Sequence, residues 1–158
     1  MPITILSVGK LKEKYLRSAC DEYTKRLSRY DKIKLIEVPD IPEKTNMSEA
    51  DIDRIKEQEG IKLLSHISPD DFVIALCIEA EQLSSEEFAE KIQALRNISR
   101  NIVFVIGGSN GLGNNIISRS NIKLSFSRLT FPHQLMRVIL IEQIYRAYKI
   151  ISKERYHK

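Results

Sequence analysis

Apolar residues recur along the chain in two periods, which predict strands alternating with helices. Short apolar runs rich in β-branched residues, such as 72–78 and 102–106, are typical of strands buried on both faces of a parallel sheet. Longer stretches with apolar residues three and four positions apart are typical of amphipathic helices. The pattern predicts strands at 4–8, 33–38, 72–78, 102–106 and 122–126, and helices at 12–30, 49–66, 133–152 and from 84 onward. This alternation indicates one α/β domain over residues 1–158 with a mostly parallel sheet.

Two of the predicted helices begin with a capping box, in which a serine and an acidic residue three positions later cap each other's backbone N–H. Ser48 and Asp51 form the first pair, and Ser84 and Glu87 form the second. The side chains expected in the core are Ile52, Ile55, Ile61 and Leu64 from the first of these helices and Phe88, Ile92 and Leu95 from the second. Gly60 is expected to be a weak point of the first helix.

The last predicted helix, 133–152, carries apolar residues around much more than one face. A helix of that kind is buried on both sides. One side can face the sheet, and the other needs a cover that no spare element of the chain supplies. We therefore expect a homodimer with this helix in the interface. A helix enclosed within one subunit is the alternative.

Charge is distributed unevenly along the chain, although the net charge is only +4. Residues 39–118 carry 7 Lys/Arg and 14 Asp/Glu, a net −7, whereas residues 119–158 carry 9 and 2, a net +7. A basic cluster is typical of a protein with a polyanionic partner. A solvated helix face would give the same pattern.

The composition indicates a globular protein without a membrane span or a metal centre. Of the 158 residues, 42% are hydrophobic, yet no apolar run approaches the ~20 residues of a spanning helix. Cys20 and Cys77 are too few for a disulfide framework, which is consistent with a reducing compartment. No histidine cluster or CxxC pair predicts a metal. Because no signal peptide precedes the first strand either, we expect a cytoplasmic protein.

The strongest candidate for a ligand site is the stretch 102–113, in which a buried strand runs into four glycines, Gly107, Gly108, Gly111 and Gly113. In open α/β sheets, ligands bind just beyond the carboxyl ends of the strands. Glycine lets a ligand approach the backbone with no Cβ in the way. The stretch therefore predicts a ligand loop, with a plain tight turn as the alternative.

Known phosphate-binding motifs do not fit this loop. A P-loop would continue after Gly113 with Lys and Ser or Thr, where the chain has Asn114 and Asn115. A dinucleotide fingerprint would need glycine where the chain has Ile116. The remaining possibility is a ligand held by backbone groups, and S-adenosylmethionine is such a ligand. Its methyl group is already activated, so an enzyme mainly has to orient donor and acceptor.

Four blocks in the C-terminal half together resemble the RlmH family. They are FVIGGSNGLG at 104–113, LSFSRLTFPHQLMR at 124–137, LIEQIYRA at 140–147 and YHK at 156–158. Members of this family are bacterial methyltransferases of the SPOUT superfamily that methylate N3 of a pseudouridine in 23S rRNA on the assembled ribosome. The resemblance covers essentially the whole chain.

The resemblance implies a SPOUT-type α/β knot with a C-terminal trefoil knot, a homodimer, and S-adenosylmethionine as cofactor. The cofactor residues that it implies, together with two glycines that allow close backbone approach, lie in three loops: Leu76, Gly107, Gly108, Ser127, Arg128, Leu129, Thr130, Phe131 and Pro132. Judged from the pattern alone, Leu76 and Phe131 could equally be core residues.

Four residues are candidates for the reacting end of the site. Removing the N3 proton of pseudouridine would be helped by a general base, and histidine is the usual one. His133 begins the last helix, where a neutral imidazole is favoured, so it could accept this proton or only bond locally. Arg137 shares its helix face, and we expect it near the acceptor base or its phosphate. The resemblance adds Tyr156, which could stack on a base, and His157.

Two other classes of function are compatible with the sequence. One is a non-catalytic factor that binds RNA or the ribosome through the basic C-terminal quarter, with no need for S-adenosylmethionine. The other is a small-molecule α/β enzyme with an unrelated nucleotide ligand and no dependence on RNA.

Overall fold

The structure is a computed structural model that describes residues 2–98 and 100–157. Five strands form one sheet in the order β2-β1-β4-β3-β5, and every pairing between them is parallel. The strands are β1 (Ile3–Val8), β2 (Ile33–Val38), β3 (Phe72–Gln82), β4 (Ile102–Ile106) and β5 (Ile122–Ser125). All five predicted strands are present, and the predicted α/β fold with its parallel sheet is confirmed.

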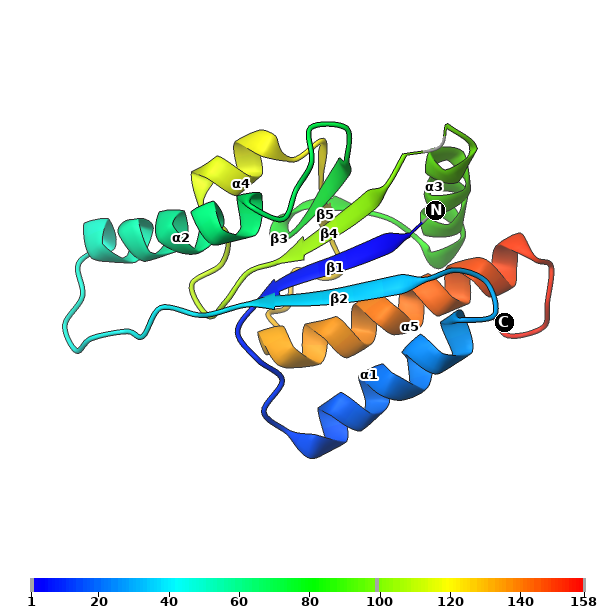
Figure 1. Ribbon diagram of the computed structural model, residues 1–158, viewed down its shortest axis with the longest axis horizontal. Coiled ribbons are helices and arrows are strands. Elements are labelled where there is room, and N and C mark those ends of the chain that lie inside the picture. The colour runs from blue at the N-terminus through cyan, green and yellow to red at the C-terminus, as the bar shows by residue number, and fades with distance from the viewer. Residues whose placement is uncertain (1, 99, 158) are drawn as a thin grey trace.

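Helices cover both faces of the sheet (Figure 1). They are α1 (Lys14–Leu27), α2 (Glu49–Leu64), α3 (Ser85–Asn97), α4 (Asn114–Arg119) and α5 (His133–Ile151). Helices α1, α3 and α5 pack on one face, where Ile5 and Phe104 point, and α2 and α4 pack on the other with Val105 and Ile116. Helix α4 was not predicted, because its six residues are too few to show a helical period.

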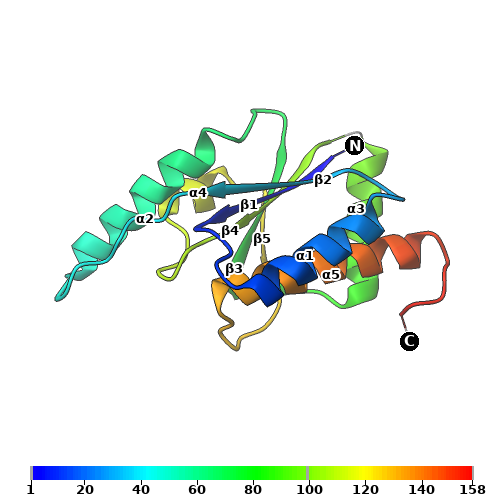
Figure 2. The same ribbon diagram turned by 60° about the horizontal axis from the view of Figure 1, so that its bottom comes forward.

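Helix α5 is flanked by two other helices of the chain. It contacts α1 along one flank and α3 along the other while its inner side meets the sheet (Figure 2). Several of its apolar side chains stay partly exposed, among them Leu135, Val138 and Ile139. The homodimer with this helix in the interface stays a prediction.

Both predicted capping boxes are formed. The Asp51 backbone N donates to Ser48 Oγ at 3.2 Å, and the Ser48 backbone N donates to Asp51 Oδ2 at 3.1 Å. The corresponding distances between Ser84 and Glu87 are 3.1 and 2.7 Å. The helix starts were predictable because a capping box depends only on local sequence.

The predicted core face of α2 is confirmed at Ile55 and differs at Ile61, while Ile52 and Leu64 are half-buried. Ile61 is 64% exposed, whereas Ile55 and Leu63 are buried together with Glu59 between them. Because a carboxylate lies among the buried residues, the pattern of hydrophobic residues alone does not identify the buried face of α2. Gly60 is also buried, and a Cβ there would overlap the Asn115 side chain, so this glycine is where α4 packs on α2.

The packing predicts the effect of removing one buried hydroxyl. Tyr148, 1% exposed, donates from its hydroxyl to Asp31 Oδ2 at 2.7 Å. Tyr148→Phe should lower the free energy of unfolding by about 1.5–3 kcal/mol, because the hydrogen bond to a charged group is lost. Urea denaturation measures this change. Tyr15→Phe is the control, since Tyr15 is 69% exposed, and its effect should stay within about 0.5 kcal/mol. Equal stabilities of the two variants would contradict the prediction.

Candidate functional site

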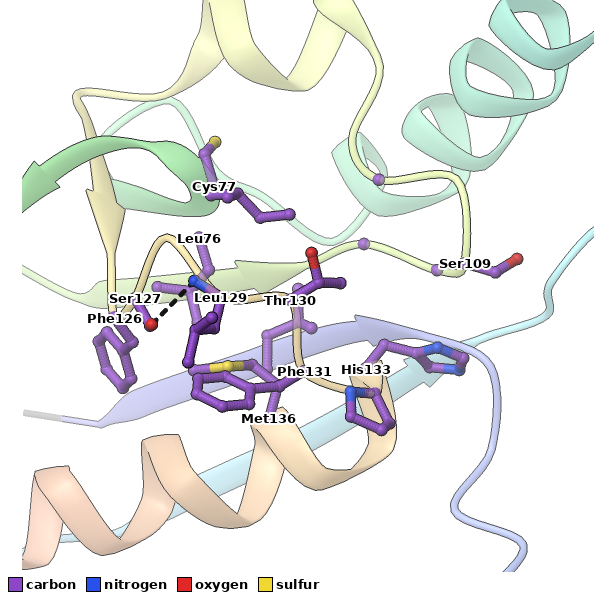
Figure 3. Close-up of a pocket in the computed structure, with 16 residues that line it drawn as sticks. Leu76, Cys77, Ser109, Phe126, Ser127, Leu129, Thr130, Phe131, His133 and Met136 are labelled. Atoms are coloured by element: carbon purple, nitrogen blue, oxygen red, sulfur yellow. Dashed lines mark hydrogen bonds between the residues drawn. The ribbon is translucent and has the colours of Figure 1, made fainter.

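A cavity of about 500 Å³ lies beyond the carboxyl end of β4 (Figure 3). Its walls come from the middle of β3 just after its pairing with β4, the glycine loop after β4, and the loop that joins β5 to α5. Most of the lining is apolar and includes Leu76, Ile106, Phe126, Phe131 and Met136. A cavity of this size and character is typical of small-molecule sites, which are mostly apolar and lie at this edge of a parallel sheet.

The structure brings most of the predicted cofactor residues to this one cavity. They are Leu76, Gly107, Gly108, Ser127, Leu129, Thr130, Phe131 and Pro132. Arg128 is exposed and does not line it. The sequence analysis missed Cys77, Ile78 and Met136, which also line the cavity. Met136 could have been predicted from the sequence, since it lies one helical turn beyond the predicted loop.

The glycine loop is both a tight turn and a wall of the cavity. The Gly111 backbone N donates to Gly108 O at 3.0 Å, and Gly111 has a φ of +86° that favours glycine. At Gly107, a Cβ would lie 2.7 Å from the backbone carbon of Gly111, so no larger residue fits there. The two interpretations of these glycines, turn and ligand loop, are therefore compatible.

Hydroxyl and carboxylate groups hold two of the walls, the β5–α5 loop and the glycine loop. In the β5–α5 loop, Ser125 Oγ donates to Ser127 O at 3.0 Å, and the Leu129 N–H donates to Ser127 Oγ at 2.9 Å (Figure 3). On the far side of the glycine loop, Glu43 accepts from Ser109 Oγ at 3.1 Å and from Asn110 Nδ2 at 2.8 Å. These contacts fix the loops on both sides of the cavity.

A buried carboxylate lies next to the glycine loop. Glu59, 4% exposed, accepts the Ile41 backbone N–H at 3.1 Å and lies next to Gly108. Burial raises its pKa. Glu59 thus ties the segment after β2 to the glycine loop. No signal in the sequence indicated this contact, because a glutamate in a helix is ordinarily exposed.

His133 lines the cavity and is half-buried at the first position of α5 (Figure 3). Burial and the nearby positive charge of Arg137 lower its pKa, and Asp40 acts in the opposite direction. The neutral imidazole is therefore favoured. Neutral histidine can accept a proton from a molecule in the cavity, which fits the chemistry expected of His133.

Arg137 lies one turn further along α5 and is not part of the cavity lining. It is 3% exposed, and its guanidinium is paired with Glu37 at 2.7 Å. It also donates to the backbone oxygens of Val8 at 2.8 Å and Gly9 at 2.6 Å. Arg137 was predicted to lie on the same helix face as His133. Its side chain points toward the ends of β1 and β2.

The tail after α5 folds back along the second half of that helix (Figure 1). The Tyr156 hydroxyl donates to Glu142 at 3.2 Å, and His157 lies between Arg146 at 3.1 Å and Glu86 at 2.7 Å. Glu142 and Arg146 come nine and thirteen residues after His133, or roughly 14 and 20 Å at about 1.5 Å per residue. Within one chain, the structure does not bring these two residues to the cavity.

Comparison with known proteins assigns the family. A family model described as "Predicted SPOUT methyltransferase" matches residues 1–157. The chain belongs to the SPOUT methyltransferase family. SPOUT methyltransferases generally use S-adenosylmethionine as the methyl donor. The parallel sheet and the family agree with the predicted SPOUT-type fold.

One solved structure similar to this SPOUT methyltransferase is that of a protein from Neisseria gonorrhoeae assigned to a methylase family. The two chains share 10% identity and superpose with a TM-score of 0.52, over 99% of this chain and 86% of the other. This likeness concerns the fold alone. Within the described residues, no group of side chains is arranged to hold a metal, and no helix has the length and apolar character of a membrane span.

The electrostatics of the SPOUT cavity predict how His133 titrates. We expect its imidazole to titrate below the roughly 6.5 of an unperturbed histidine, as measured by NMR of the ring protons. Between the two pKa values, the unfolded chain binds more protons than the folded one. The stabilisation from this group is therefore present above the unfolded pKa and is lost as pH falls toward the folded pKa. His133→Gln should remove the signal and this part of the pH dependence. A titration midpoint above 6.5 would refute the prediction.

Proposed function

We propose that this protein is an RlmH-type enzyme that methylates N3 of a pseudouridine in 23S rRNA on the assembled ribosome, with S-adenosylmethionine as donor. The observation that carries the proposal is the composition of the cavity. Two of the sequence blocks that resemble RlmH, 104–113 and 124–137, are separate in sequence and supply two of its walls. A ribosomal substrate would place the enzyme in the cytoplasm.

The residues of the cavity fit S-adenosylmethionine. Leu76, Ile106 and Phe126 offer an apolar surface for a planar adenine, and Gly107 and Gly108 let the ligand approach the backbone closely. Every residue of the loop 127–132 before Pro132 has a backbone N–H, and that of Leu129 is already donated to Ser127 Oγ. When bound, S-adenosylmethionine supplies a methyl group on a positively charged sulfur. The chain's own task is to orient it against the acceptor nitrogen.

His133 is proposed as the general base. It lies in the cavity lining, where the N3–H of the acceptor base would meet it, and its neutral form is favoured. N3 gives its proton to the imidazole, and the electron pair left on N3 takes the methyl group. S-adenosylhomocysteine leaves as the second product, and the protonated His133 then loses its proton to solvent.

A homodimer is proposed because one chain cannot bring its tail to its own cavity. Tyr156 and His157 are held beside Glu142 and Arg146, roughly 14 and 20 Å along α5 from His133, and neither lines the cavity of its own chain, so we propose that they act at the cavity of a second copy. Two exposed apolar side chains, Tyr15 at 69% and Leu135 at 37%, lie at the starts of α1 and α5, near the cavity. They supply apolar surface that a partner subunit would cover.

The charge distribution supports an RNA partner of defined shape. Arg128, next to the cavity, and Lys123 and Arg155 are exposed. With a net charge of only +4, electrostatic attraction alone would give weak and salt-sensitive binding to free RNA. The assembled ribosome, which presents the acceptor in a fixed shape, is therefore the proposed substrate.

Methyl transfer from labelled S-adenosylmethionine tests this function. The acceptors are ribosomes that lack the modification, stripped 23S rRNA and a sample without RNA. We expect label in the rRNA of the ribosomes and little in stripped rRNA. Salt-sensitive ribosome binding without any response to S-adenosylmethionine would instead favour the non-catalytic binding factor. Methylation of a small molecule in the absence of RNA would favour the third class.

The glycine loop offers a test of the cofactor site. Gly107→Ala should weaken S-adenosylmethionine binding at least tenfold, because the new Cβ would push the Gly111 backbone and deform the cavity wall. Isothermal titration calorimetry measures the affinity, and circular dichroism checks the fold. Ile61→Ala is the control, since Ile61 is 64% exposed and outside the cavity lining. Unchanged affinity in a folded Gly107→Ala protein would place the cofactor elsewhere.

A further inference from the structure

Arg137 is buried, and its guanidinium bonds to groups of the protein itself. Its guanidinium makes a 2.7 Å ion pair with Glu37 through one terminal nitrogen. The other terminal nitrogen donates to Val8 O and Gly9 O at 2.8 and 2.6 Å. The remaining nitrogen, Nε, is buried. A phosphate would have to compete with Glu37, an exposed carboxylate that already holds one terminal nitrogen of this guanidinium.

The pair of Arg137 and Glu37 joins four pieces of the fold. Glu37, near the end of β2, also accepts the Leu11 N–H at 2.9 Å. Gly9, which follows β1 with a φ of +84°, donates its N–H to Val38 O at 2.8 Å. The ends of β1 and β2, the segment after β1 and the first turns of α5 therefore meet at one ion pair, whose guanidinium is buried and whose carboxylate is exposed.

His133 lies near the same glycine. A Cβ placed on Gly9 would stand 3.9 Å from His133 Nε2 and 3.9 Å from the Arg137 nitrogen that bonds Gly9 O. The same point is 4.0 Å from Asp40 Cβ. A shift of the Gly9 turn would therefore change the support of the imidazole directly.

We propose that Arg137 is a positioning residue: together with Glu37 it fixes the Gly9 turn against His133, and so sets the place of the imidazole at the cavity without touching RNA. The inference rests on the proposed function, in which His133 accepts the proton from N3. It replaces the expectation that Arg137 lies near the acceptor base or its phosphate.

The charges around His133 agree with this role. Arg137 on α5 and burial favour the neutral imidazole, while Asp40 from the segment after β2 opposes them. Glu37 faces Arg137, and its charge compensates part of the guanidinium charge. The Arg137 guanidinium thus places a fixed positive charge near a base that has to be neutral before it can accept a proton.

Two conservative variants test the proposal in the methyl-transfer assay. Arg137→Lys keeps the charge but loses the geometry that reaches Glu37, Val8 and Gly9 together, and Glu37→Gln keeps the shape but removes the charge. We expect each to lower kcat by roughly tenfold to a hundredfold, because a displaced catalytic group costs that much. The KM for ribosomes should stay within about twofold, and the double variant should be little worse than the worse single variant.

The matched control is Glu22→Gln, which removes the charge from an exposed ion pair, Glu22 with Arg26 at 2.9 Å, and should leave kcat unchanged. A phosphate-binding Arg137 would behave differently. Loss of its contact would raise the KM for ribosomes and reduce the salt slope by about one, while Glu37→Gln would leave kcat near that of the wild type. That pattern would overturn the proposal.

NMR separates this proposal from the proposed function and does not need an RNA substrate. In Glu37→Gln, the ring signals of His133 should shift, and the Gly9 amide should exchange with solvent at least tenfold faster. Signals of His133 and Gly9 that match the wild type would overturn the positioning role even if methylation is observed. Shifted signals in a protein that methylates no rRNA would keep the role and reject the proposed function. Glu37→Gln also serves if Arg137→Lys fails to fold.

Discussion

The backbone of Gly107 approaches that of Gly111 so closely that no side chain can stand between them, and the form of the cavity depends on this contact. It turns the chain sharply at the end of β4, where a continuing strand would close the space. The loops on either side are then fixed by polar side chains, Glu43 on one side and Ser127 on the other. Backbone contact therefore shapes the centre of the site, and hydrogen bonds hold its edges.

Local rules account for most of the elements that the sequence predicted. The strands 33–38 and 102–106 and the starts of α2, α3 and α5 were predicted at their observed bounds, because strand periodicity, capping boxes and Pro132 act over a few residues. On α2, Ile61 was wrongly expected in the core, because the buried face instead includes Glu59, a carboxylate whose partner, the Ile41 N–H, comes from a segment 18 residues away. Partners of that kind cannot be read from a local pattern.

The same distinction applies to the site. The resemblance indicated the right loops, and the cavity gathers them. The spacing of His133 and Arg137 correctly placed both on one face of α5, but spacing cannot say where a face points. The sheet decides that: the ends of β1 and β2 receive Arg137, while the β5–α5 loop leaves His133 in the cavity wall. The position of Tyr156 and His157 was beyond the sequence, because it depends on contacts with Glu142 and Glu86 across the surface of α3 and α5.

Gly107 and Gly111 are required for different physical reasons, and this difference governs how the loop can change in evolution. Gly107 has no space for a Cβ, so every replacement meets backbone atoms. Gly111 has open space around its Cβ position, and only its φ of +86° constrains it. Asparagine, which adopts left-handed backbone more readily than other residues with side chains, is therefore an accessible replacement at position 111 and not at position 107. We therefore expect substitutions in this loop to be tolerated at position 111 and not at position 107.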